Sequence, residues 1–560
     1  MINTVMPPGL ILILGAFLLA ITDGRIRKTL IIVLPAIALV LIWITPNGHN
    51  VVIPFLEYEL LPLSPNPTGK VFATIFALMT MVGGLYGVNQ ATKAEICAAF
   101  AYAGSAIGVT FAGDLMSVFV FWELMAAGST IVIWAANSSL AYKASYRYLL
   151  VHLMGGVVLM SGIVAHVYET GSIAFTLLEL NSVGSWLILA GFLVNAGAPP
   201  FSAWIADAYP EASPSGSVFL SAFTTKTAVY ALMITFAGAD VLIYVGLYMV
   251  FYGIIYALLE NDMRRILAYS IVNQVGFMVT AIGIGTEMAL NGATAHAFAH
   301  IIYKALLLMS AGAVLMQTGE RRCSHLGGLF QTMPMTAACG IVGALAISSF
   351  PFTSGFVTKS LETSAAAYEG LAFVWFLLLA ASAGVFLHAG IKFPWFVFFQ
   401  KDSGMRPSEA PLNMRLAMLI FAILCIAIGV FPNVLYNILP YAVKYEPYTT
   451  DHLVTQFQLL MFAGFAFFAL LPMMKRTLTI SLDFDWFYRR LFMRSSGAFF
   501  RVFWAVDAYV RRLILRGIGG LFGFVEAHAP NGILMKSRPS SSMVIWVTVL
   551  LATYLVISFV

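Results

Sequence analysis

Long apolar stretches recur along most of this chain, and they constrain its fold more than any other feature. A helix of about 17–25 predominantly apolar residues spans the hydrocarbon core of a bilayer. Lipid offers the backbone no hydrogen-bond partners, so only helices and closed barrels cross it. The sequence therefore predicts an all-α integral membrane protein with about sixteen transmembrane helices. These spans are predicted near 7–22, 28–45, 71–88, 94–112, 115–137, 145–167, 185–204, 215–237, 240–260, 264–284, 289–317, 334–365, 371–398, 413–431, 455–473 and 541–559.

The composition excludes an ordinary soluble enzyme. Charged residues make up 10% of the 560 residues and hydrophobic residues 60%, whereas soluble domains are about a quarter charged. The four cysteines are scattered without C-x-x-C spacing, so no iron–sulfur, haem or structural zinc site is indicated. Neither a G-x-G-x-x-G fingerprint nor a Walker motif is present. We therefore expect no cofactor and no metal. The energy source is then expected to be an ion gradient or a partner protein.

Basic residues are distributed unequally between alternate loops. If loop 24–28 is cytoplasmic, the Lys and Arg residues outside the spans fall on the cytoplasmic side, apart from Lys70 and Lys444. This asymmetry is the positive-inside signal, and it predicts that both termini are external. The start of the chain lacks the basic region of a cleavable signal, so the first apolar run is expected to be a retained span.

Ionisable side chains lie inside several of the predicted spans. Placing a charge at the bilayer centre costs about 2.5–3.5 kcal/mol even on the lenient insertion scale, so such residues usually have a function. His296, His300 and Lys304 lie at positions i, i+4 and i+8 of one span and therefore share one helical face. Carboxyl, amine and imidazole groups that sense one another's charge can pass protons along. The candidates for such a proton relay are Glu123, Lys226, His296, His300, Lys304 and Lys359.

Structural roles remain open for the same residues. Glu123 could hydrogen-bond a neighbouring helix, the lysines could form buried ion pairs, and the two histidines could be helix-packing donors. The spacing of His296 and His300 also suits zinc, but no third ligand is evident in the sequence. Lys392 lies near a span end and is expected to snorkel to the cytoplasmic surface. Asp114 and Asp207 are expected to be turn or capping residues.

Two spans contain helix-breaking residues, at 195–200 and 348–355. Proline interrupts the helical hydrogen-bond ladder, and freed carbonyls at membrane depth need polar neighbours or water. Two interrupted spans, five apart, are typical of inverted repeats with ion sites at the midplane. We expect two inverted five-helix repeats, each with a broken helix. The predicted segments are N-terminal helices 1–93, repeats 94–237 and 240–398, C-terminal core helices 413–473, an amphipathic segment 477–530 and a final helix 541–559.

The segment 477–530 differs from the rest of the chain because arginines alternate with aromatic residues along it. A basic, aromatic, amphipathic stretch is typical of a helix that lies in the membrane interface. The sequence predicts a C-terminal interfacial amphipathic helix on the cytoplasmic side, or a helix that docks on a neighbouring subunit.

Five motifs in order resemble the antiporter-like subunits shared by respiratory complex I, membrane-bound hydrogenases and multisubunit Mrp sodium/proton antiporters. The chain length and the ending at 474–486 look most like the D subunit of bacterial Mrp antiporters. The motifs are F-V-F-W-E-L at 119–124, the stretches 206–230 and 261–270, H-A-F-A-H-I-I-Y-K-A-L at 296–306 and S-G-F-V-T-K at 354–359.

The resemblance implies roles for the candidate residues. Glu123 matches the family's key glutamate, and Lys226 a lysine that relays protons inward from it. The histidines of 296–306 and Lys304 match the central relay. Lys359 matches the ionisable residue of the second broken helix, near the external exit.

One departure concerns the lysine that the family places in the first broken helix, where this chain has Asn195. Ser202 and Tyr209 likewise stand where the family often has histidines. Asn195 can hydrogen-bond Glu123 but cannot supply a charge. Glu123 must then take another partner, such as Lys226 or a group of an adjacent subunit, or the first half-channel is altered.

The function implied by the resemblance is that of a proton-translocating subunit of an Mrp-type sodium/proton antiporter. Such a subunit works with other subunits in the bacterial plasma (inner) membrane, with protons and sodium as its ions and no nucleic acid as a partner. The alternatives are a proton-pumping subunit of a complex I-like or hydrogenase-type redox enzyme, a subunit that energises inorganic-carbon uptake, and a scaffold that transports nothing.

Overall fold

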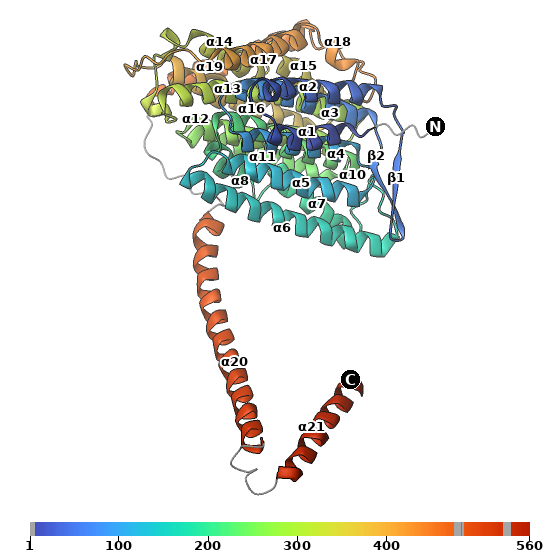
Figure 1. Cartoon of the computed structure of the whole chain (residues 1–560). Helices are drawn as coiled ribbons and strands as arrows, with labels where there is room; N and C mark the ends of the chain where they lie inside the picture. Colours follow the sequence, from blue (N-terminus) through green and yellow to red (C-terminus); the bar gives the residue numbers. More distant parts are fainter. Residues whose placement is uncertain (1–5, 475–482, 484–485, 530–538, 560) are drawn as a thin grey trace. The chain divides into compact units, whose positions relative to one another are not determined.

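The computed structural model describes residues 6–474, 483, 486–529 and 539–559. The chain forms two compact units, Met1–Asp485 and Trp486–Val560. The first unit is a bundle of helices (Figure 1). Its first half contains α1 Pro8–Ile21, α2 Gly24–Ile44, α3 Pro67–Gly87, α4 Lys93–Phe111, α5 Leu115–Trp134, α6 Ser139–Thr170, α7 Val183–Ala196, α8 Ala203–Ala208, the 3-10 turn Tyr209–Glu211, α9 Pro214–Leu220 and α10 Thr224–Thr235.

The second half of this unit begins with two helices joined by a short loop, α11 Asp240–Leu259 and α12 Met263–Ile284. The remaining elements are α13 Glu287–Thr318, 3-10 turns Cys323–His325 and Leu329–Gln331, α14 Pro334–Ile347, α15 Ser354–Tyr368, α16 Ala372–Val385, π-helical turns Phe386–Lys392 and Trp395–Phe399, α17 Leu412–Val430, α18 Asn433–Tyr436, α19 Thr450–Ala469 and the 3-10 turn Leu471–Met474.

The prediction of a multi-pass helical membrane protein is confirmed. Among the described residues, 12 helices are long and apolar enough to cross a membrane, and shorter apolar helices occupy Pro8–Ile21, Val183–Ala196, Pro334–Ile347 and Met543–Ser558. Each of them overlaps one of the predicted spans, and several begin or end a few residues outside it. The number of crossings, their orientation and the inverted repeats stay predictions.

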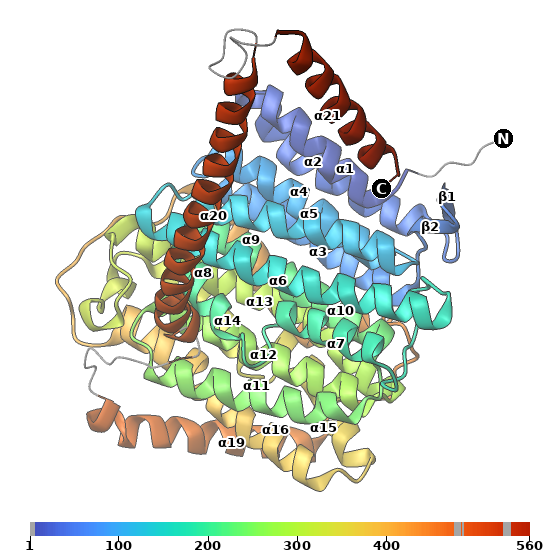
Figure 2. The same ribbon diagram turned by 90° about the horizontal axis from the view of Figure 1, so that it is seen from below.

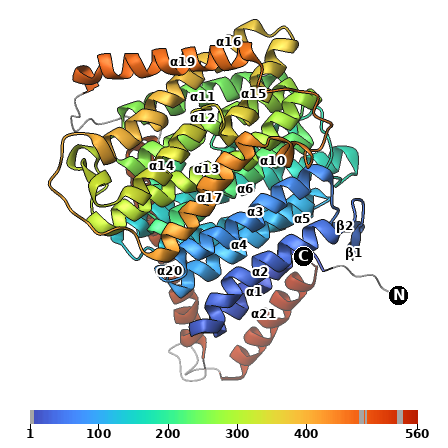
Figure 3. The ribbon, with the colours of Figure 1, turned by 90° about the horizontal axis from the view of Figure 1, so that it is seen from above.

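The centre of the bundle is formed by α12, α13 and the α9–α10 pair. The most apolar stretch of α12 is completely buried, whereas only 22% of the corresponding stretch of α19 is buried. Helices α1 and α2 lie at one edge of the bundle, and α16 and α19 at the opposite edge (Figures 2 and 3). Ionisable residues on α10, α12 and α13 are therefore screened from lipid by other helices.

An antiparallel hairpin between α2 and α3 departs from the expected all-helical fold. Strand β1 spans Val51–Phe55 and β2 spans Tyr58–Leu63, with Ile53 opposite Leu60. Asp114 anchors it, because one carboxylate oxygen accepts a hydrogen bond from the Leu61 N–H at 2.6 Å. The other oxygen caps α5 through the Ser117 N–H at 2.8 Å. The expected capping role of Asp114 is confirmed.

Both predicted helix interruptions are present. Helix α7 ends at Ala196 before a left-handed Gly197, and α14 ends at Ile347, seven residues before α15 begins. A third interruption was not predicted. Residues 221–223 separate α9 from α10 inside the predicted span 215–237, although Ser-Ala-Phe contains no residue that breaks helices.

The second unit contains the π-helical turn Phe487–Phe492, the 36-residue helix α20 Met493–His528 and helix α21 Pro539–Phe559. Within the described residues, the predicted amphipathic segment is helical and the final predicted span coincides with α21. The parts of segment 477–530 at 477–482, 484–485 and 530 lie outside the described residues. Placement of α20 at the membrane interface stays a prediction.

Candidate functional site

The histidines and the lysine predicted on one helical face lie on α13, and all three side chains are fully buried. Of the three, His296 contacts the most polar side chains. Its Nδ1 lies 3.0 and 2.9 Å from the two carboxylate oxygens of Glu362, and its Nε2 lies 3.1 Å from Gln274 Oε1 and 2.8 Å from the Tyr303 hydroxyl. Three helices, α12, α13 and α15, thus meet at one imidazole.

Glu362 is a buried carboxylate that the sequence analysis missed. It is 0% exposed and forms an ion pair with His296 when the imidazole is protonated. Its position three residues after Lys359 on α15 was the available signal, because i and i+3 residues share a helix face. The carboxylate can stabilise a proton on His296 and release it when the charge nearby changes.

Lys304 and His300 continue the polar face of α13. The Lys304 ammonium donates to Ser270 Oγ at 2.8 Å and to the Leu267 carbonyl at 3.3 Å, both on α12. Neither ring nitrogen of His300 has a hydrogen-bond partner within the described residues. Since buried polar groups are nearly always satisfied, an imidazole without a hydrogen-bond partner among lysines is unusual for a purely structural residue.

Lys226 and Lys359 each reach back to a carbonyl freed by a helix interruption. Lys226 donates to the Ser221 carbonyl, just after the end of α9, at 2.6 Å, and Lys359 donates to the Ile347 carbonyl at the end of α14 at 2.5 Å. Helix ends leave carbonyls unsatisfied and carry partial negative charge, which favours a cation. Both lysines are at most 2% exposed, so the interrupted helices provide the polar environment they need.

The first candidate on the chain, Glu123 of α5, is half-buried and stands apart from the cluster on α13. Its carboxylate packs against Gly156 of α6, where an added Cβ would lie 2.1 Å from Oε1. That oxygen has no hydrogen-bond partner within the described residues. The glycine provides the space that the carboxylate occupies.

Asn195 does not bond Glu123, so that expectation is wrong. Its Oδ1 lies 2.8 Å from Nδ1 of His152 on α6, and both side chains are 1% exposed. Asn195, one residue before the end of α7, contacts α6 at His152. Glu123 contacts α6 one turn later, at Gly156. Sequence reasoning passed over His152, an isolated histidine in an apolar span.

Hydroxyl groups lie between this region and Lys226. Tyr148, one turn before His152, donates to Ser129 Oγ at 2.9 Å and lies 3.4 Å from Thr224 Oγ1. Thr225, the next residue, accepts from the Lys226 ammonium at 3.0 Å. The hydroxyls of Tyr148 and Thr224 thus form a polar connection between α6 and the start of α10.

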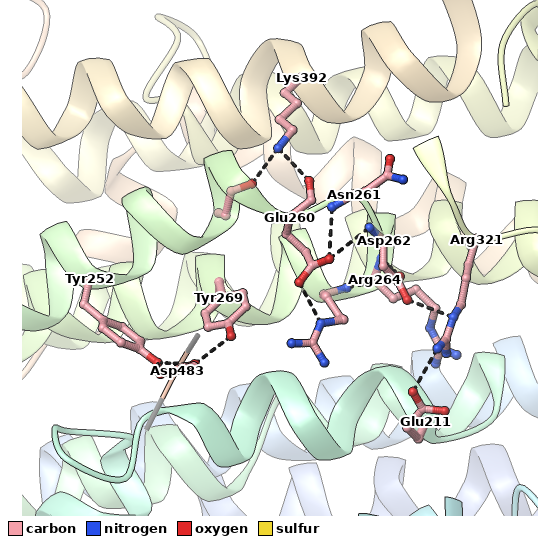
Figure 4. A network of polar contacts seen from close by, with 12 residues as sticks. Glu211, Tyr252, Glu260, Asn261, Asp262, Arg264, Tyr269, Arg321, Lys392 and Asp483 are labelled. Carbon is pink, nitrogen blue, oxygen red and sulfur yellow. Dashed lines mark hydrogen bonds and ion pairs between the residues drawn. The ribbon is translucent and has the colours of Figure 1, made fainter. Parts of the chain in front are cut away.

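A second polar network joins the loops at one end of the bundle (Figure 4). Arg264 donates to the carbonyls of Pro210 at 2.8 Å and Ser213 at 3.0 Å. Arg321 bridges Asp262 at 2.8 Å and Glu211 at 3.0 Å. The motifs 206–230 and 261–270 therefore contact each other, and their charged residues hold the chain between α8 and α9 against the start of α12.

Two sequence expectations are wrong in this region. Lys392 does not reach the surface: it is 1% exposed and donates to the carbonyls of Ala257, Leu258 and Glu260 at the end of α11, at 2.8, 2.5 and 2.8 Å (Figure 4). The terminal carbonyls of α11 carry partial negative charge and lack intrahelical partners, so they favour a buried cation. Asp207 is no cap either, because it forms a bidentate ion pair with Arg147 at 2.6 and 2.8 Å.

Asp483, which follows α19 in the chain, also lies at this end of the bundle. It is 7% exposed and accepts hydrogen bonds from the hydroxyls of Tyr252 on α11 and Tyr269 on α12, each at 2.7 Å (Figure 4). It fixes the chain that follows α19 to the α11–α12 pair. Within the described residues, no three His, Cys, Asp or Glu side chains are grouped closely enough to hold a metal ion.

Comparison with known proteins places the chain in one family. The profile described as "NADH:quinone oxidoreductase/Mrp antiporter, TM" matches residues 112–398, a range that contains the candidate residues from Glu123 to Glu362. The D subunit of the Na(+)/H(+) antiporter of Alkalihalophilus pseudofirmus is 31% identical over 273 residues, which are 45% of this chain and 55% of that protein. Hydrogenase-4 component B of Escherichia coli is 25% identical over 426 residues, 67% of this chain and 63% of that protein.

Among solved structures, the Mrp complex from Dietzia sp. contains a chain of the same fold. The TM-score is 0.78 at 23% identity, with 92% of this chain and 63% of that chain covered. This chain thus spans about half to two thirds of the length of these three proteins. The similarity in fold covers 92% of this chain. The similarity in sequence to the family profile covers the candidate site.

Proposed function

The chain belongs to the NADH:quinone oxidoreductase/Mrp antiporter family of transmembrane proteins, and we propose that it is the proton-translocating subunit of a multisubunit sodium/proton antiporter of Mrp type. Its relatives include subunits of multisubunit antiporter and respiratory complexes. Partner subunits, a bacterial plasma membrane, and protons and sodium as transported ions are parts of this proposal.

The observation that carries the proposal is the buried array of Lys226, Lys304, Lys359, His300 and the His296–Glu362 pair. Ionisable groups inside a membrane are costly and usually mark ion pathways. A purely structural role is satisfied by one hydrogen-bonded pair. It does not account for three buried lysines around an imidazole without a hydrogen-bond partner in the described part of the chain.

These groups are close enough for the charge of one to affect the next. His300 lies within electrostatic range of Lys226, Lys304 and Lys359, and Lys304 within range of the two other lysines. A proton that leaves Lys304 therefore raises the affinity of Lys226, Lys359 and His300 for a proton. Successive transfers of this kind move protons along the array, and Glu362 stabilises the proton while it resides on His296.

The identity of the coupled cation is inferred from the 31% identical relative, which is the D subunit of a Na(+)/H(+) antiporter. Sodium binding in the assembled complex would alter the charge near one end of the array and bias the protons towards the other end. In this scheme the chain supplies the proton route, and partner subunits complete the route for sodium.

The test compares Lys304→Ala with Lys444→Ala, a change of the same kind at an exposed residue. Each variant is co-expressed with the partner subunits in cells that lack their own sodium/proton antiporters. Sodium is added to everted vesicles, and proton movement is followed with a pH-sensitive dye. We expect Lys444→Ala to match the parent and Lys304→Ala to be inactive in a complex of normal size. An active Lys304→Ala contradicts the proposal.

A second candidate function is that of a proton-pumping subunit of a redox enzyme. It is favoured by the likeness to hydrogenase-4 component B, which extends over 67% of this chain. The two functions differ in what drives proton movement. A redox subunit moves protons when its complex receives an electron donor such as hydrogen and an acceptor, in vesicles free of sodium; an antiporter subunit requires sodium.

A further inference from the structure

His152 of α6 is a buried histidine between Glu123 and Lys226, outside the array on which the proposed function rests. Its side chain is 1% exposed, and its Nδ1 lies 2.8 Å from Asn195 Oδ1. The amide oxygen accepts a hydrogen bond, so Nδ1 is the protonated nitrogen of the neutral ring. Nε2 then carries a lone pair and has no hydrogen-bond partner within the described residues.

We propose that His152 is the proton-carrying residue of the first half of the route, holding the proton at Nε2 between Glu123 and Lys226. The inference rests on the proposed function and assigns a further residue to it. When Nε2 takes up a proton, the ring becomes an imidazolium whose Nδ1–H still donates to Asn195. When Nε2 gives the proton up, the neutral ring with the same Nδ1–H is restored.

Glu123 reaches the same face of α6 one turn beyond His152. Residues four apart lie next to each other on a helix surface, and His152 is four residues before Gly156. The carboxylate of Glu123 occupies the place that a side chain at 156 would take. A Cβ added at the adjacent Gly155 would lie 3.7 Å from Oδ1 of Asn195. The carboxyl and the imidazole therefore flank one turn of α6.

On its other side, His152 contacts a group that leads towards Lys226. The ring centroids of Tyr148 and His152 are 4.0 Å apart, and the Tyr148 hydroxyl lies 3.4 Å from Thr224 Oγ1. The Lys226 ammonium donates to the adjacent Thr225 hydroxyl. Tyrosine and threonine hydroxyls both donate and accept hydrogen bonds, so they can pass a proton without holding a charge.

The other ionisable groups around His152 do not compete for this role. Asp207, which lies on α8 with Trp204, is held in a bidentate ion pair by Arg147. The ring of Trp204 meets the imidazole edge-on at 4.6 Å between centroids, and Tyr209 contacts Trp204 edge-on at 5.6 Å between centroids. Glu123 is left as the carboxyl group available to exchange a proton with His152.

The alternative is a structural histidine that only hydrogen-bonds Asn195, and His152→Gln separates the two. A glutamine side chain can still donate a hydrogen bond to Asn195 Oδ1, but it cannot take up a proton. The matched control is His166→Gln, the same change near the end of the same helix. The double variant His152→Gln/Asn195→Lys replaces the lost proton site, because a lysine at 195 brings an amine within reach of the same place.

All variants are assayed in the assembled complex by sodium-dependent proton movement in everted vesicles, with complex size measured after detergent extraction. We expect His152→Gln to lower the rate at least tenfold, His166→Gln to keep it, and the double variant to move protons at least threefold faster than His152→Gln. A rate for His152→Gln within twofold of the parent overturns the inference. So does a double variant that assembles and is no faster than His152→Gln.

Lys304→Ala is measured in the same series to separate the two proposals. If Lys304→Ala is inactive and His152→Gln keeps the parental rate, only the role of His152 is refuted. If Lys304→Ala keeps the parental rate, the proposed proton-translocating function fails.

Discussion

Replacement of Glu362 by glutamine is the most informative change within the array. Glutamine has nearly the same shape, and its side-chain oxygen can still accept from Nδ1 of His296, 2.9–3.0 Å away. Only the negative charge is lost. The variant therefore tests whether the charge of Glu362 stabilises a proton on His296, as the relay requires.

The expected magnitude follows from the geometry. Glu362 and His296 are both 0% exposed, so solvent does not screen their interaction. A hydrogen bond to a charged group contributes about 1.5–3 kcal/mol and a neutral one about 0.5–1.5 kcal/mol, so loss of the charge alone removes about 1–1.5 kcal/mol. Every 1.36 kcal/mol corresponds to a tenfold change in rate. If proton residence on His296 limits transport, Glu362→Gln slows it by about 5- to 13-fold.

The assay is the initial rate of sodium-dependent proton movement in everted vesicles with equal amounts of assembled complex. Glu369→Gln is the matched control, because this residue is exposed just beyond the end of the same helix. We expect the control to keep the parental rate. A parental rate for Glu362→Gln would refute the reasoning, since it would mean that transported protons never depend on the His296–Glu362 pair.

Four further predictions test other parts of the structure. Gly156→Ala should assemble normally but displace the Glu123 carboxylate, whose Oε1 lies 2.1 Å from the added Cβ, and transport should fall about as far as in Glu123→Ala. Glu123→Asp should keep part of the activity that Glu123→Ala loses. Lys392→Met should lower the melting temperature of the complex relative to Lys401→Met, because it leaves three carbonyls of α11 without their buried cation, at about 1–3 kcal/mol for each unsatisfied group. Cysteines placed in the predicted cytoplasmic segments 138–144, 318–333 and 401–412 should be labelled only from the cytoplasm, and external labelling would contradict the predicted topology.

The spans were predictable because their signal is local and strong. A helix in lipid needs about 20 apolar residues, and the 12 long helices of the described residues lie where hydropathy places them. The interruptions after Ala196 and Ile347 were predictable for the same reason, since Pro and Gly mark them. The break at 221–223 was not, because Ser-Ala-Phe contains neither Pro nor Gly to mark it. The carbonyl that it frees at Ser221 is satisfied by the Lys226 ammonium five residues later.

The pairing of the buried residues was harder to predict than their positions. Glu362 follows Lys359 on a helix that also holds serines and threonines, and His152 is an isolated histidine in an apolar span. Nothing in either span identifies the partner of the buried residue. Asn195 lies at the predicted break, but its orientation towards His152 depends on how α6 packs on α7. The burial of Lys392 was not predicted because the sequence gives its distance from the end of its own span. It does not show that the end of α11 lies next to it.

The central claim is that the buried array carries protons in exchange for sodium. The most direct measurement uses the purified complex in liposomes, with the membrane potential clamped at zero and an imposed sodium gradient, while internal pH and sodium flux are recorded together. The account predicts that sodium entry drives proton exit in the parental complex, and that both fluxes stop together in Lys304→Ala. Sodium flux without any change of internal pH in the parent, or identical proton flux in Lys304→Ala, would contradict it.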